Sequence, residues 1–162
     1  MQVKEIYTPN DILEVSTLAH AIWREYYPPI IGKEQVEYML QKFQTPKAIL
    51  ANINEGYDYF ILLEQNHQVG YCCVQKRAHT LFVSKLYIQK KDRQKGYAKA
   101  CVDFLCTLAH ENGLSSLSLS VNKNNLLAIK AYTALGFVNT GALVQDIQEG
   151  YVMDDYSFEL GC

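Results

Sequence analysis

The spacing of hydrophobic residues predicts a chain in which helices and strands alternate. Residues 2–7 can form a first strand, and residues 9–26 repeat hydrophobic side chains every three to four positions, as an amphipathic helix does. The pair Pro28-Pro29 must end that helix, because proline has no backbone N–H to donate within a helix. A second amphipathic helix and a short third one are expected before Gly56, so three helical pieces follow the first strand.

The rest of the chain reads mainly as strands. Residues 57–64 and 68–77 are rich in aromatic and β-branched residues and are separated by a short polar turn, which is typical of a hairpin. The elements expected after this hairpin are a strand at 81–89, a helix at 97–112, a strand at 117–121, a helix at 125–135 and strands at 137–144 and 151–160. This order predicts a mixed α/β sheet with helices on both faces.

Length and charge limit the classes of protein to consider. At 162 residues the chain is expected to form one domain, residues 1–162. Its net charge of −2, from 15 basic and 17 acidic side chains, gives no reason to expect a nucleic-acid or membrane partner. The first ten residues lack the apolar core of a signal peptide, and no apolar run reaches membrane-spanning length. We therefore expect a cytoplasmic protein, and the sequence leaves a homodimer open.

Cysteine and histidine spacing suggests no metal or redox site. The five cysteines, Cys72, Cys73, Cys101, Cys106 and Cys162, include no CxxC pair. We expect reduced, mostly structural thiols, and Cys72 and Cys73 lie mid-strand, where they are weak candidates for a nucleophile. The four histidines show no ligand spacing, so no metal is expected.

A basic run, KKDRQKGYAKA at residues 90–100, stands out in this slightly acidic chain and lies between a strand and a helix. It contains neither GxxxxGK followed by Ser or Thr nor the three glycines of GxGxxG. Gly96 and Ala98 are small enough for a ligand to approach the backbone, and free N–H groups at a helix start favour an anion. The run predicts a pyrophosphate site, although its four lysine side chains can equally form a solvated charged face.

Two motifs resemble those of the GCN5-related N-acetyltransferase (GNAT) superfamily. Arg93, Gly96 and Ala98 match the acetyl-coenzyme A loop Q/R-x-x-G-x-G/A, and KLYI at residues 85–88 looks like the central strand that precedes it. The second motif is N-x-x-A-x-x-x-Y-x-x-x-G-F, and it is met by Asn125, Ala128, Tyr132, Gly136 and Phe137.

The resemblance covers residues 57–160 closely and implies a GNAT-like fold. That fold has a largely antiparallel central sheet of about seven strands with helices on both faces, in the order β-αα-βββ-α-β-α-ββ. It also implies an N-acetyltransferase whose only cofactor is the co-substrate acetyl-CoA. In such enzymes a primary amine attacks the thioester directly.

The coenzyme site follows from the same resemblance. Backbone N–H groups of the basic loop are expected to hold the pyrophosphate, and the pantetheine arm is expected to pair with the preceding strand like an extra strand. A backbone N–H near Ile88 is the expected oxyanion donor. Residues expected to bind the coenzyme are Leu86, Tyr87, Ile88, Arg93, Gln94, Lys95, Gly96, Tyr97, Ala98, Lys99 and Asn125. For Asn125, a helix N-cap is a compatible role.

Tyr132 is the expected general acid, because a phenol with a pKa of about 10 suits a thiolate leaving group with a pKa of about 8.5. Packing in a helix–sheet core is its alternative role. For the general base, strict alternation in YVMDDYSFEL puts Asp154 in an apolar row, where desolvation raises the pKa of a carboxylate. A bulge would exchange it for Asp155, and a water relay is an equal alternative. Lys85 is no credible base unless it is strongly desolvated.

The acceptor pocket is expected at WREYYPPIIG, residues 23–32, where Trp23, Tyr26 and Tyr27 offer aromatic rings. Such rings and nearby carboxylates suit a cationic amine, so a small amine or polyamine is the favoured acceptor. The same aromatics can instead belong to the core or a dimer contact. The alternatives are a protein or peptide acceptor and a non-catalytic coenzyme A sensor. An open groove would favour a peptide, and a closed aromatic pocket would favour a small amine.

Overall fold

Seven strands form one sheet in the computed structural model, which describes residues 1–162 except for the side chain of residue 145. Their order across the sheet is β1-β2-β3-β4-β5-β7-β6, and all neighbours are antiparallel except β4 and β5, which are parallel. The strands are β1 (Gln2–Glu5), β2 (Tyr57–Glu64), β3 (His67–Lys76), β4 (Leu81–Ile88), β5 (Ser116–Asn122), β6 (Val138–Asp146) and β7 (Val152–Gly161). This confirms the mixed, largely antiparallel sheet expected from the sequence.

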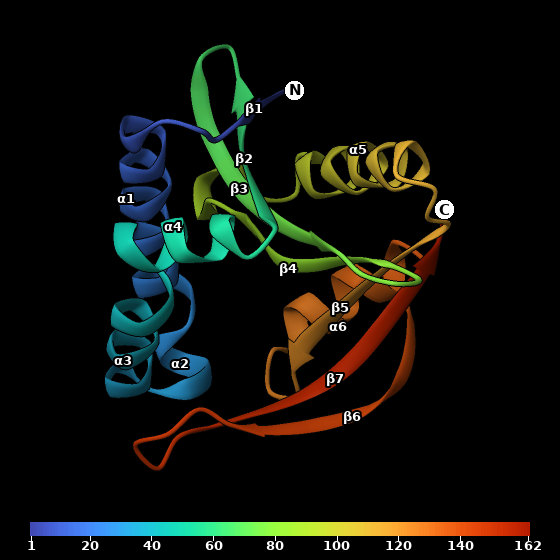
Figure 1. Ribbon diagram of the computed structural model, residues 1–162. Helices are drawn as coiled ribbons and strands as arrows, with labels where there is room; N and C mark the ends of the chain where they lie inside the picture. The colour runs from blue at the N-terminus through green and yellow to red at the C-terminus, as the bar shows by residue number, and fades with distance from the viewer.

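Helices cover both faces of this sheet, with α1 to α4 on one side and α5 and α6 on the other (Figure 1). They are α1 (Pro9–Tyr26), α2 (Pro28–Ile31), α3 (Lys33–Phe43), α4 (Pro46–Asn54), the 3-10 turn η1 (Lys90–Asp92), α5 (Tyr97–Glu111) and α6 (Leu126–Ala134). Because strand side chains alternate, β2 and β3 supply both cores. Phe60, Leu62, Cys72 and Val74 face α5, whereas Tyr59, Ile61, Tyr71 and Cys73 face α1.

The first N-terminal helix begins at Pro9, as the sequence predicts, but the N-terminal helices number four rather than three. Thr8 caps α1, since its Oγ1 accepts from the Asp11 N–H at 3.1 Å and the Asp11 carboxylate accepts from the Thr8 N–H at 3.0 Å. Proline disfavours a helix interior but suits a first turn. Pro28 therefore ends α1 and also starts α2, the additional four-residue helix.

A bulge in β4 separates β4 from β5 and opens the sheet. The two strands pair only at Leu81↔Leu117, Phe82↔Ser118 and Val83↔Leu119. Directly after Val83 the register between β3 and β4 shifts, so that Ser84 has no single residue opposite it. Bulges bend the strand that carries them. From this point β4 and β5 diverge, and the sheet is split at its centre.

The β6–β7 hairpin reaches across to the N-terminal helices, and its tip lies below α3 in Figure 1. The hydroxyl of Tyr38 and the Nζ of Lys42, both on α3, donate to the Ile147 carbonyl at 2.9 and 2.8 Å. Tyr38 also stacks on Tyr151, with ring centroids 5.1 Å apart. The hairpin and α3 therefore close one end of the split.

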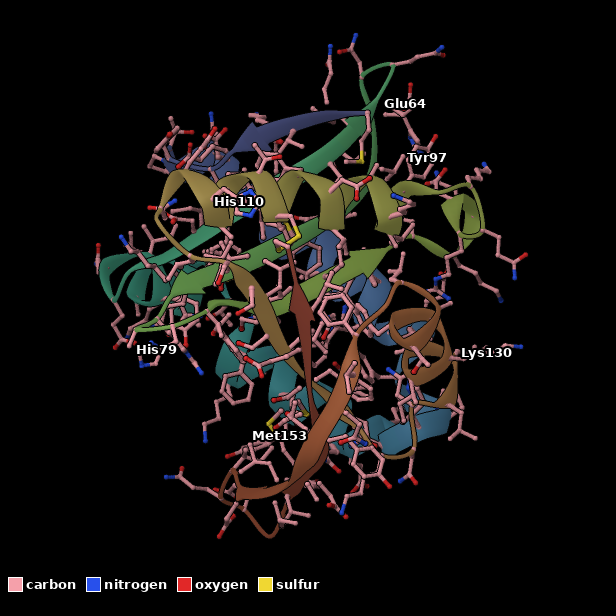
Figure 2. All side chains as sticks on the ribbon, turned by 90° about the vertical axis from the view of Figure 1, so that its right-hand side faces the viewer. Glu64, His79, Tyr97, His110, Lys130 and Met153 are labelled. Carbon is pink, nitrogen blue, oxygen red and sulfur yellow. A yellow bond between two sulfur atoms is a disulfide. The ribbon has the colours of Figure 1, made fainter. Side chains whose placement is uncertain are left out.

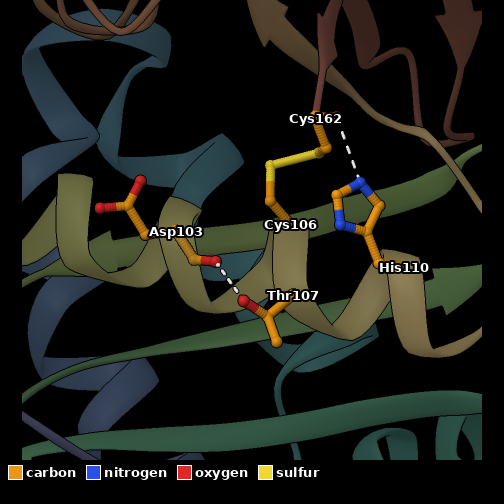
Figure 3. The surroundings of a disulfide bond; sticks show 5 residues. All are labelled: Asp103, Cys106, Thr107, His110 and Cys162. Atoms are coloured by element: carbon orange, nitrogen blue, oxygen red, sulfur yellow. Dashed lines mark hydrogen bonds between the residues drawn. A yellow bond between two sulfur atoms is a disulfide. The ribbon is translucent and has the colours of Figure 1, made fainter.

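A disulfide joins Cys106 of α5 to Cys162 after β7 (Figure 3). Next to it, His110 Nε2 donates to the Cys162 carbonyl at 3.1 Å. The expectation of reduced thiols is therefore wrong for these two residues, because folding brings two cysteines 56 positions apart to a Cα–Cα distance of 5.3 Å. Cys72, Cys73 and Cys101 are free and buried.

None of the helices described is long and apolar enough to cross a bilayer. The cytoplasmic location and the oligomeric state stay predictions.

Candidate active site

The split between β4 and β5 contains a cavity of about 650 Å³. It runs from the start of α5 to the β6–β7 hairpin, and Tyr97 and Met153 mark these two ends in Figure 2. Its walls include all the expected coenzyme residues except Lys95, together with Tyr132 and the three aromatics expected at the acceptor end. The structure thus brings together residues from positions 23 to 155 of the sequence.

The basic loop ends at the N-terminus of α5, where no side chain caps the free backbone N–H groups. Gln94 and Gly96 adopt positive φ angles of 62° and 86°, and Gly96 is the N-cap of α5. Because glycine has no side chain, no N-cap group occupies the first-turn N–H donors, which remain available to an anion. Lys95, which does not line the cavity, has its Nζ 3.7 Å from Asp92.

Asp92 anchors this loop, a role that the sequence analysis missed. Its carboxylate is buried, and its Oδ2 lies 3.0 Å from Nε2 of His67 in the β2–β3 hairpin. The only sequence signal is a single carboxylate within a basic run.

The free edge of β4 faces the cavity at Leu86 and Ile88. In an antiparallel ladder, hydrogen-bonded and non-bonded pairs alternate. The Gln89 N–H donates to the Val69 carbonyl of β3 at 2.8 Å, so the backbone groups of Ile88 and Leu86 point away from β3. At Leu86 and Ile88, β5 has already diverged from β4. The backbone N–H groups of Leu86 and Ile88 therefore point into the split.

Arg93 lies at the entrance of the split, where it contacts both β4 and α1. Its Nε donates to the Ile88 carbonyl at 3.1 Å, and its guanidinium lies 4.6 Å from the centre of the Tyr26 ring. The Tyr26 hydroxyl in turn donates to Oδ1 of Asn125. The same Asn125 oxygen accepts from the Ala128 N–H at 3.2 Å, so Asn125 caps α6 and also links it to α1.

Tyr132 lines the cavity from α6 and also packs against Phe137, with ring centroids 5.4 Å apart. Burial raises its pKa above the ordinary value, and neighbouring Tyr27 adds to the shift. The phenol therefore stays protonated at neutral pH and carries a proton to donate, but burial makes it a weaker acid than the free phenol considered in the sequence analysis.

Other aromatic side chains form a hydrogen-bonded cluster beside the middle of the cavity. Trp23 Nε1 donates to the Tyr71 hydroxyl at 2.9 Å, and the hydroxyls of Tyr27 and Tyr87 share a hydrogen bond of 2.9 Å. Burial raises the pKa of all three tyrosines. Trp23, Tyr27 and Tyr87 thus give the cavity a neutral aromatic wall with Tyr71 behind it, and the expected lining residues are also part of the core.

Of the two aspartates of β7, the structure buries Asp155 and not Asp154, the residue expected to be desolvated. Asp154 lies on the same strand face as Tyr156, as alternation requires, but β7 extends beyond the core here and the Asp154 side chain is 49% exposed. It pairs with Lys123 Nζ at 2.7 Å. The expectation that Asp154 is desolvated is therefore wrong.

Asp155 points the other way, into the cavity, and is only 5% exposed. Burial, followed by the charge of Asp154, raises its pKa to about 6.

Lys85 is also buried against the cavity. Its Nζ lies 3.2 Å from Ser84 Oγ and 5.6 Å from the centre of the Tyr59 ring. Burial lowers its pKa. It therefore meets the condition of desolvation that the sequence alone does not reveal. Among the described residues there is no cluster of metal-binding side chains.

Comparison with known proteins agrees with this geometry. The model of the acetyltransferase (GNAT) family matches residues 17–137. The match confirms the resemblance drawn from the two motifs, the acyltransferase class and acetyl-CoA as the co-substrate of the family. A comparison with curated protein sequences gave no significant match.

Solved structures share the fold at low sequence identity. The PaiA N-acetyltransferase of Thermoplasma acidophilum, in complex with coenzyme A, is 15% identical with a TM-score of 0.78, and both chains are covered completely. A GCN5-related N-acetyltransferase of Rhodopseudomonas palustris is 16% identical with a TM-score of 0.81, over 99% of this chain and 95% of that one. The ribosomal-protein-alanine N-acetyltransferase of Brucella melitensis is 18% identical with a TM-score of 0.69, again over both chains.

Proposed function

Because the chain belongs to the GNAT family of acetyltransferases, we propose that it transfers the acetyl group of acetyl-CoA to a small primary amine. The observation that carries this proposal is one continuous cavity, which joins an open helix N-terminus to an aromatic pocket through the split between β4 and β5.

The coenzyme fits this cavity in one direction. The pyrophosphate meets the N–H groups at the start of α5, where the helix dipole favours negative charge. The pantetheine arm then runs along β4 and takes the place of a neighbouring strand. The N–H groups of Leu86 and Ile88, which point into the split, are the donors for the arm and for the thioester oxygen.

The chemical step is a direct attack. The amine nitrogen forms a bond to the thioester carbon while a β4 N–H stabilises the negative charge that develops on the oxygen. The carbon–sulfur bond then breaks, and the thiolate takes the phenolic proton of Tyr132. The proton lost by the amine restores the phenol.

A covalent acyl-enzyme is disfavoured by the state of the free cysteines. Cys72 and Cys101 form a buried pair, which together with burial raises the pKa of Cys72. Burial raises the pKa of Cys73 to about 11. Since the thiolate is the nucleophile, neither group is activated at neutral pH.

The closed acceptor end supports a small amine rather than a polypeptide. The β6–β7 tip is bonded to α3 there, and Gln35 of α3 also donates to the Val152 carbonyl at 3.2 Å. An extended peptide needs an open groove, which these contacts obstruct. The alanine acetyltransferase of Brucella melitensis shares the fold, so peptide acceptors belong in any test.

The proposal is tested by measuring coenzyme A affinity by calorimetry and thiol release from acetyl-CoA with a panel of amines and peptides. Tyr132→Phe is expected to lower kcat about a hundredfold and leave coenzyme affinity unchanged. Tyr156→Phe, a half-buried tyrosine outside the cavity, is the matched control and should retain wild-type kcat.

Three outcomes would count against the proposal. A failure to bind coenzyme A would refute the site itself. Binding without turnover of any acceptor would favour the coenzyme A sensor. An unchanged kcat in Tyr132→Phe would remove the general acid.

A further inference from the structure

The acceptor end of the cavity combines an apolar wall with a single carboxylate. Its wall comes from α1, α2, α3 and the β6–β7 hairpin. The side chains that form it are Trp23, Ile31, Met39, Leu143, Val152 and Met153. Met39 and Trp23 are buried, whereas Leu143 and Val152 are 46% and 50% exposed.

Asp155 is the carboxylate, and it lacks a partner. It is 5% exposed, and none of the side chains that the structure describes gives it a hydrogen bond or ion pair. Tyr27 lines the same cavity, and its pKa is raised first by burial and then by the neighbouring charges of Tyr26 and Asp155. An unpaired buried charge is costly, and such a group is normally matched by a cation.

The charges around the cavity limit what that cation can be. Five charged side chains line it: the basic Lys85, Arg93 and Lys99 and the acidic Asp92 and Asp155. Asp92 is engaged with His67 under the coenzyme loop. One carboxylate therefore remains for the acceptor. A polycation would find one counter-ion and an apolar wall, whereas a single ammonium on a hydrophobic body matches both.

We propose that the acceptor is a hydrophobic or aromatic primary monoamine and that Asp155 binds its ammonium group. This proposal rests on the proposed function. It narrows the acceptor from a small amine or polyamine to a hydrophobic amine with one ammonium group. The amine binds as the ammonium ion with its body against Met39 and Met153. It then loses one proton to solvent, and the neutral nitrogen attacks the thioester.

Calorimetry on the enzyme saturated with coenzyme A tests this assignment. The probes are 2-phenylethylamine, hexylamine, spermidine and the neutral analogue 2-phenylethanol. Asp155→Asn carries the test. The matched control is Asp154→Asn, the same substitution one residue away on the outer face of β7.

The expected result has two parts. The monoamines bind wild type and Asp154→Asn with equal affinity, at least about tenfold tighter than spermidine, and lose at least about tenfold in Asp155→Asn. 2-Phenylethanol binds Asp155→Asn no more weakly than wild type, which separates a lost charge contact from a damaged pocket.

The proposal is overturned if the monoamines bind Asp155→Asn as tightly as wild type, if spermidine or a peptide is preferred, or if no amine binds the wild-type complex. Coenzyme A affinity distinguishes these failures from a failure of the proposed function. Loss of coenzyme binding refutes the proposed function, whereas intact coenzyme binding with the wrong amine preference refutes only the assignment of Asp155.

Discussion

Replacing Asp155 by Asn should stabilise the fold at neutral pH while it weakens acceptor binding. In the native protein the pKa of this carboxyl is about 6, compared with 3.8 for the free group, because burial disfavours its charged form. Below pH 4 the group is protonated in both the folded and the unfolded chain. As the pH rises toward 6, the unfolded chain loses its proton first, so the free energy of unfolding falls. Above pH 6 the destabilisation is complete.

The size of the effect follows from the pKa difference of about 2 units, which corresponds to about 3 kcal/mol. The carboxylate borders a cavity that water can enter, and this screening lowers the figure to about 1 to 2 kcal/mol. For a domain of this length, that stabilisation corresponds to an increase in Tm of about 3 to 6 °C.

The assay is urea unfolding of wild type and Asp155→Asn at several values between pH 5 and pH 8. We expect the variant to be more stable at pH 8, and we expect the difference to shrink as the pH falls through 6. Asp154→Asn is the comparison variant, because its carboxylate is half exposed and paired with Lys123 and its charge is only the second contribution to the raised pKa of Asp155. We expect it to change the stability much less than Asp155→Asn does. A variant that is less stable than wild type at pH 8, or a difference that does not change with pH, would refute the reasoning.

Two further substitutions test the framework that positions the site. In Gly70→Ala the new Cβ would lie 2.1 Å from the Tyr87 carbonyl oxygen, so β3 and β4 must separate. We expect the free energy of unfolding of this variant to fall by about 2 kcal/mol and its coenzyme A binding, measured by calorimetry, to weaken. Gly161→Ala is the control: its new Cβ meets no atom within 4 Å, so neither quantity should change. In Cys162→Ser the disulfide that spans 56 residues is lost, and unfolding in non-reducing buffer should show about 2 to 4 kcal/mol lower stability. A reductant should remove that difference, and equal wild-type stability with and without reductant would contradict the stabilising role.

The sequence by itself determined the elements and the family. Hydrophobic periodicity predicted the seven strands, because a strand or helix shows its buried face directly in the spacing of its residues. Cap and turn residues such as Thr8 and Gly96 marked where helices begin, since these positions depend on local torsions and local hydrogen bonds. The two motifs indicated the coenzyme loop and the Tyr132 position for the same reason, as each is contained within one loop and one helix.

Only the tertiary structure decided which groups meet. Alternation put Asp154 and Asp155 on opposite faces correctly, but the depth of each face depends on whether a helix or the hairpin covers that part of β7. Likewise, Cys106 and Cys162, or Tyr26 and Asn125, become neighbours only when distant elements pack. Burial and long-range proximity depend on how whole layers fit together. Periodicity along one strand carries no information about how the layers pack. This packing decides that Asp155, and not Asp154, supplies the carboxylate at the acceptor end.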